Sequence, residues 1–87
     1  MNSYTVIVRR WRDTRGNTYH SVSVWEHRED GIKALGRKPF TYGYGSQYEV
    51  TAFEIAKEHG YTGDVHDWKH DESILFSVSD VRKKSDL

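Results

Sequence analysis

The stretch Tyr42-Gly43-Tyr44-Gly45-Ser46-Gln47-Tyr48-Glu49 decides the fold, because it joins an aromatic strand to a helix through two glycines. Ser46 is followed three residues later by Glu49, which is the spacing of a capping box. In that arrangement the Ser46 hydroxyl accepts from the backbone N–H of Glu49, and the Glu49 carboxylate accepts from the backbone N–H of Ser46. The pattern predicts a helix over residues 47–59 that ends at Gly60.

Upstream of this stretch, two runs rich in β-branched and aromatic residues predict two strands, over residues 4–12 and 18–26. Residues 13–17 between them contain Gly16 and Asn17, which both tolerate positive φ. The sequence therefore predicts a hairpin with a five-residue loop.

The hydrophobic pattern of the two strands selects one register. A five-residue loop sets Val8 opposite Val22 and Val6 opposite Val24, so that both valine pairs share one face. A loop shorter by two residues would set Val6 opposite Glu26 and is the second choice. In the preferred register the other face carries Ile7, Arg9, Trp11, Tyr19, Trp25 and two serines.

The segment after the hairpin is less regular. Residues 27–38 are polar and read as a loop, a frayed hairpin or a long hairpin extension. Pro39 lacks a backbone donor, so the residues after it either start a strand or lie at a sheet edge. Alternating aromatic residues then predict a short third strand with one aromatic face, formed by Phe40, Tyr42 and Tyr44.

The remaining elements complete a small α+β fold. The predicted helix carries one apolar stripe, consisting of Tyr48, Ala52, Ile55, Ala56 and His59. Residues 61–72 read as an acidic loop with a helical turn near 65–69, residues 73–81 as a final strand, and residues 82–87 as a mobile polar tail. The order β-β-β-α-β predicts a small antiparallel sheet of three to four strands with one helix on one face, in a single domain over residues 1–87.

Composition narrows the class of protein. The chain has 87 residues, no cysteine and a formal net charge of zero. We expect no disulfide and no cysteine-based zinc site or nucleophile. Neither a signal-peptide pattern nor a membrane-spanning apolar run is visible, which predicts a cytoplasmic protein. The charge is uneven: residues 1–45 carry eight basic and four acidic residues, whereas residues 46–72 carry two and seven.

The hairpin face opposite the valines is the main candidate binding surface. Arg9, Trp11, Tyr19 and Trp25 combine flat rings with a cation, which is the composition of protein-interface anchors. The same face could bind nucleic acid through the arginines, for which the candidates are Arg9, Arg10, Arg12 and Arg15. Two further possibilities are that the rings only stabilise the hairpin and that open faces or edge strands pair in a homodimer.

Two other groups are weaker candidates. The backbone at Gly43, Gly45 and Ser46 could hold an anion beside the helix N-terminus, although no phosphate-loop or dinucleotide motif is present. His66 and His70 are four residues apart and could share a metal ion, although a solvated acidic loop is the simpler interpretation. No serine has the neighbourhood of a nucleophile elbow. We therefore expect no enzyme activity and no cofactor.

Several strings of this sequence resemble small uncharacterised proteins encoded by phages and prophages. The residues that carry the resemblance lie within about 4–60 and are Trp11, Asp13, Gly16-Asn17-Thr18-Tyr19-His20-Ser21-Val22, Tyr42-Gly43-Tyr44-Gly45, Gln47-Tyr48 and Thr51-Ala52. The family has no assigned activity, so the resemblance transfers no functional residue. It implies an accessory protein in the host cytoplasm that binds a host or phage protein, for example as an inhibitor of host machinery or defence.

Overall fold

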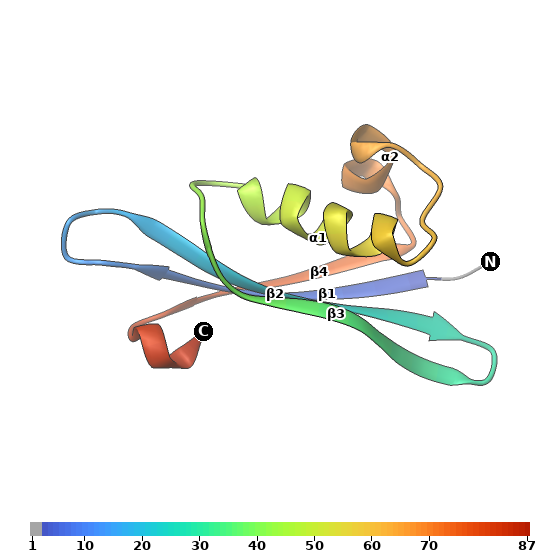
Figure 1. Cartoon of the computed structure of the whole chain (residues 1–87), viewed down its shortest axis with the longest axis horizontal. Helices are drawn as coiled ribbons and strands as arrows, with labels where there is room; N and C mark the ends of the chain where they lie inside the picture. The colour runs from blue at the N-terminus through green and yellow to red at the C-terminus, as the bar shows by residue number, and fades with distance from the viewer. Residues whose placement is uncertain (1–2) are drawn as a thin grey trace.

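In the computed structural model, which describes residues 3–87, four strands form one sheet and two helices cover one of its faces (Figure 1). The elements, in chain order, are β1 (Ser3–Arg12), β2 (Thr18–Arg28), β3 (Gly31–Tyr42), α1 (Gln47–Glu58), α2 (Val65–His70), β4 (Ile74–Val81) and the 3-10 helix η1 (Lys84–Asp86). The α+β class and the order β-β-β-α-β are confirmed. The short helix α2 lies where a helical turn was predicted.

The hairpin of β1 and β2 has the predicted register. Val6 pairs with Val24, Val8 with Val22, and Trp11 with Tyr19. In the loop, the backbone N–H groups of Arg15 and Asn17 both donate to one carboxylate oxygen of Asp13, at 2.9 and 2.8 Å. These bonds close the five-residue loop and so fix which residues face each other across the strands.

The third strand is much longer than predicted. Residues 27–38 form the end of β2, a tight turn and the first part of β3, so the interpretation as a loop was wrong and the hairpin extension is correct. Two register shifts interrupt the pairing of β3 with β2. Leu35 is the extra residue at one shift and is buried, whereas Pro39 lies at the other, on an edge strand as expected. These bulges break the two-residue alternation that would have revealed the strand.

The sheet is mixed rather than wholly antiparallel. Its strand order is β3-β2-β1-β4, and β4 runs parallel to β1. After the helices, the chain re-enters the sheet at the beginning of β1, where the backbone N–H of Tyr4 donates to the oxygen of Ser73 at 3.0 Å. Because β4 starts beside the first residues of β1, it can pair along β1 only by running in the same direction.

The core lies between the sheet and the helices. All four valines of the hairpin are fully buried, and Ala52, Ile55 and Ala56 of α1 pack above them. Trp68 of α2 is also fully buried, with its ring edge-on to Tyr4, Tyr61 and Phe76. Trp68 therefore fixes α2 to the core, within the stretch that was predicted to be an acidic loop.

The capping box lies on α2 instead of α1. Ser46 stands at the N-terminus of α1 with φ −95° and ψ 19°, and its hydroxyl makes no capping bond. At α2, the Asp64 carboxylate accepts from the backbone N–H of Asp67, and the Asp67 carboxylate accepts from that of Asp64. The prediction of a capping box at Ser46 was therefore wrong. A capping residue needs the extended backbone that Asp64 has and Ser46 lacks.

One buried histidine links the sheet to α1. His20 of β2 is 1% exposed, and its Nε2 lies 2.8 Å from the Thr51 hydroxyl. Burial lowers the pKa of His20 below its ordinary value of 6.5, although a hydrogen bond with the backbone of Gly43 works in the opposite direction. The folded state therefore favours neutral His20.

This burial predicts that stability falls in mild acid. The unfolded chain binds a proton at His20 at higher pH than the folded chain does, so the free energy of unfolding decreases as the pH drops below 6.5. Denaturant unfolding measured from about pH 7.5 to 5.5 should show this decrease, because carboxylates titrate at lower pH. The His20→Gln variant should lose the slope, and the exposed-site control His59→Gln should keep it. A wild-type slope that survives in His20→Gln would assign it to another group.

Candidate functional site

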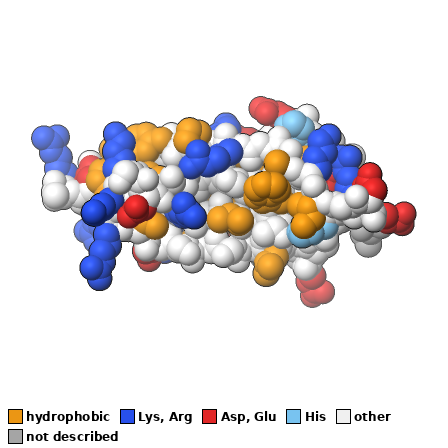
Figure 2. Space-filling view, turned by 90° about the horizontal axis from the view of Figure 1, so that it is seen from below, with side chains coloured by type: hydrophobic (Ala, Val, Ile, Leu, Met, Phe, Trp, Pro, Cys, Tyr) orange, Lys and Arg blue, Asp and Glu red, His pale blue; other side chains and the backbone are white. Residues whose placement is uncertain are grey.

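The face of the sheet opposite the helices, here called the open face, carries most of the exposed large apolar side chains (Figure 2). Hydrophobic side chains gather on it in two groups, with Lys and Arg side chains between them. The open face therefore divides into an aromatic end, a basic middle and an apolar end.

The aromatic end is a cluster of five rings, called the aromatic cluster, formed by Trp11, Tyr19, Phe40, Tyr42 and Tyr44. Tyr19 lies at its centre, stacked on Phe40 with ring centroids 4.6 Å apart and on Trp11 at 5.7 Å. Tyr42 meets Tyr19 edge-on at 5.4 Å and Tyr44 at 5.3 Å. A hydrogen bond with Tyr44, with burial as a further cause, raises the pKa of Tyr42 to about 12. Each ring packs against at least one other ring of the cluster, so the cluster stabilises this end of the sheet.

The apolar end forms a shallow groove of about 310 Å³, called the apolar groove, lined by Thr5, Ile7, Trp25, His27 and Ile32. Trp25 is 36% exposed, Ile7 40% and Ile32 65%. The Thr5 hydroxyl lies 2.6 Å from Nε2 of His27, so the two polar groups in the groove are already paired. A surface that is mainly apolar and has few unsatisfied polar groups is suited to contact with another protein.

The basic middle consists of Arg9 and Arg37, called the arginine pair. With Ile7, Trp25, Ser21 and Ser23 they line a cleft of about 250 Å³ that shares Ile7 and Trp25 with the apolar groove. The guanidinium of Arg9 donates to the main-chain oxygen of Asp86 at 3.2 Å, and that of Arg37 to the main-chain oxygen of Leu87 at 3.1 Å. Residues 82–87, predicted to be a mobile tail, thus contact the open face in this structure. Their motion in solution stays a prediction.

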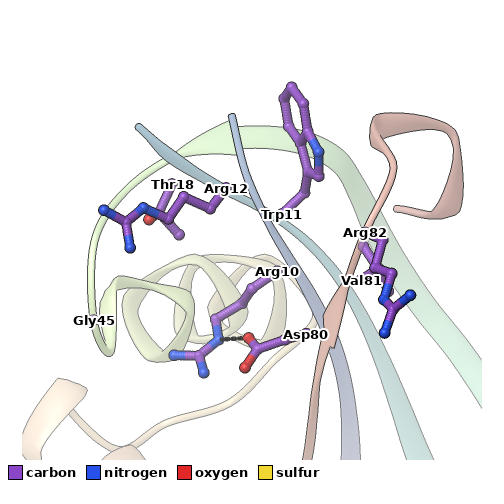
Figure 3. Close-up of a pocket in the computed structure, with 8 residues that line it drawn as sticks. All are labelled: Arg10, Trp11, Arg12, Thr18, Gly45, Asp80, Val81 and Arg82. Carbon is purple, nitrogen blue, oxygen red and sulfur yellow. Dashed lines mark hydrogen bonds and ion pairs between the residues drawn. The ribbon is translucent and has the colours of Figure 1, made fainter. Parts of the chain in front are cut away.

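The arginines proposed for nucleic acid do not share one face. Arg9 is on the open face, Arg10 and Arg12 project from the opposite side of β1, and Arg15 lies in the loop. Figure 3 shows Trp11 pointing away from Arg10 and Arg12. Arg10 forms an ion pair with Asp80 at 2.9 Å, which offsets part of its charge. A cleft of about 490 Å³ lies at this end of the sheet, lined by Arg10, Arg12 and Arg82 among others.

The turn at Gly43 and Gly45 has structural reasons for its glycines. A Cβ at Gly43 would lie 2.5 Å from Cγ of Gln47, and Gly45 has a φ of +57°. The backbone N–H of Gly43 donates to the oxygen of Thr18, so it is already used. The structure therefore explains these glycines without an anion, whereas the Ser46 hydroxyl beside them makes no capping hydrogen bond.

The rings of His66 and His70 lie 4.6 Å apart on α2. Within residues 3–87, no group of three His, Asp or Glu side chains is arranged to hold a metal ion.

No helix in the described part of the chain is long and apolar enough to cross a membrane.

Comparison with protein-family models, curated proteins and solved structures finds no match for this chain. None of these comparisons bears on the function, which is therefore inferred mainly from the geometry and charge of the open face. Of the predicted partner-binding residues, Arg9 and Trp25 line one cleft, whereas Trp11 and Tyr19 belong to the aromatic cluster. Ile32 and Arg37 were not predicted as site residues, because the bulges hide their strand from the sequence pattern.

Because Tyr19 and Trp25 lie in different groups, replacing each with alanine should lower the free energy of unfolding by a different amount. Tyr19→Ala removes the central ring of the aromatic cluster and should lower the free energy of unfolding by about 2 kcal/mol. Trp25→Ala removes a more exposed ring from the apolar groove and should cost about half as much. Denaturant titrations of both variants test this order. Equal losses, or a larger loss for Trp25→Ala, would mean that Trp25 is mainly structural.

Proposed function

We propose that this protein is a non-enzymatic binding module that uses the apolar groove and the adjacent arginine pair to hold another protein. The observation that carries the proposal is the continuity of the two sites through Ile7 and Trp25. A partner segment that places an apolar side chain in the groove would bring its neighbouring polar groups to Arg9 and Arg37. Exposed aromatic and arginine anchors are the commonest energetic centres of protein interfaces.

Charge supports a partner segment that is acidic. The charged side chains that the described strands project onto the open face are those of Arg9 and Arg37, and both are positive. The charges of Arg10, Lys38 and Asp80 lie on the other side, where Lys38 pairs with Glu54 of α1. Opposite charge on the partner speeds encounter and sets orientation.

A protein is favoured over nucleic acid because the groove is aliphatic as well as aromatic. Ile7 and Ile32 have no role in base stacking or phosphate contact, whereas they suit an apolar partner side chain. The cleft at Arg10, Arg12 and Arg82 supports nucleic acid as a second candidate. The resemblance to phage and prophage proteins favours a host protein as the partner.

The proposal predicts that groove variants lose a captured partner. The full chain, immobilised and exposed to lysate of the host cell, should retain a protein that the double variant Trp25→Ala/Ile32→Ala binds at least about tenfold more weakly. Lys57→Ala/Glu58→Ala, on the exposed surface of α1, is the matched control and should retain it fully.

Three results would contradict the protein-binding function. One is capture that the groove variant does not weaken. Another is tight binding of DNA or RNA at about 50 mM salt that weakens steeply as salt rises. The third is a self-associated chain, seen by light scattering, whose dimer blocks the groove.

A further inference from the structure

The segment after β4 crosses to the open face of the sheet. Figure 1 shows η1 on the side of the sheet opposite α1 and α2. Besides the hydrogen bonds from Arg9 and Arg37, Nζ of Lys84 lies 4.8 Å above the centre of the Phe40 ring. Residues 84–87 therefore touch both the arginine pair and the edge of the aromatic cluster.

We propose that residues 82–87 act as an intramolecular strap over the arginine pair, and that carboxylates of the binding partner displace it. The inference rests on the proposed function, since it concerns the same open face. The strap gives the two guanidinium groups acceptors while no partner is bound. It leaves the apolar groove uncovered, because Ile7, Trp25 and Ile32 stay exposed.

The strap is held weakly enough to be displaced. Residues 82–86 are all exposed, and Leu87 is half-buried. Among residues 3–87, the contacts found for the segment are two hydrogen bonds from exposed arginines and one cation–π contact at the surface, each of modest strength in water.

Carboxylates suit the arginine pair better than the strap does. Each guanidinium now makes one hydrogen bond to a main-chain oxygen, that of Asp86 for Arg9 and that of Leu87 for Arg37. A carboxylate of the partner can accept two parallel hydrogen bonds from one arginine, so it binds more strongly than a single main-chain oxygen. The strap compensates through its covalent attachment, which keeps it at high effective concentration. A partner must therefore bring carboxylates and an apolar anchor together.

The first experiment tests strap docking without any partner. Heteronuclear 15N NOE values for residues 84–87 of the full chain should be close to those of the strands. In the double variant Arg9→Gln/Arg37→Gln they should fall to those of a free chain end. Arg12→Gln/Arg15→Gln removes the same charge elsewhere and should leave them unchanged. A wild-type segment that is already flexible, or a segment that stays ordered without the arginine pair, would overturn the strap.

The second experiment tests displacement with a defined probe. The peptide acetyl-Glu-Leu-Glu-Leu-amide should shift the side-chain N–H signals of Arg9, Arg37 and Trp25 and lower the NOE values of residues 84–87. The matched peptide acetyl-Gln-Leu-Gln-Leu-amide should do neither. Ser85→Gly, which loosens η1 without changing the charge of the open face, should bind the acidic peptide about threefold more tightly.

These results separate the two proposals. A docked segment that the acidic peptide fails to release, or equal binding by wild type and Ser85→Gly, overturns the strap while the groove and its captured partner stand. The proposed function would instead be contradicted if the variant Trp25→Ala/Ile32→Ala captured the partner as well as the wild-type chain does.

Discussion

One layer of helices can cover only one face of a sheet, and this constraint organises the whole molecule. The four hairpin valines take the covered face, where α1 and Trp68 of α2 exclude water from them. Their burial is the main hydrophobic contribution to folding. Because side chains alternate along a strand, the same register that buries the valines sends Ile7, Arg9 and Trp25 to the open face. The proposed binding surface is thus a direct consequence of the core.

The open face meets water without a second helical layer because half of it packs against itself. Tyr19 stacks between Trp11 and Phe40, so these rings bury area against each other instead of against another element. The apolar groove has no such internal partner, since Trp25 is absent from the ring contacts of the aromatic cluster. The proposed binding role is therefore assigned to Trp25, Ile7 and Ile32, and not to Trp11 and Tyr19.

The features predicted correctly from the sequence lie where side chains alternate or repeat regularly. The hairpin register followed from two valine pairs and a turn-forming loop, and the position of α1 followed from its apolar stripe. Both signals are local, and tertiary contacts do not oppose them. The hairpin face that carries Arg9 and Trp25 was predictable for the same reason.

Other features depend on contacts that no local pattern records. The edge strand β3 has one open face and two bulges, so its sequence looks like a loop, and Arg37 and Ile32 were missed with it. The parallel direction of β4 is set by where the chain returns after α2, which alternation cannot reveal. Trp68 sits in an acidic run, and its burial depends on contact with Tyr4 and Phe76.

The proposed strap would also divide specificity between two parts of the open face. Arg9 and Arg37 contact main-chain oxygens of Asp86 and Leu87, which any sequence would offer. In the proposed function the arginine pair therefore recognises oxygen acceptors, both main-chain oxygens and carboxylates. Selectivity between partners must come from the neighbouring groove, where Ile7, Trp25 and Ile32 accept some apolar shapes and exclude others. A partner with the right apolar side chain but no carboxylate would have to leave the strap in place, and one with carboxylates alone would gain no anchor. Under the proposed function, only a segment with both features would use the full surface.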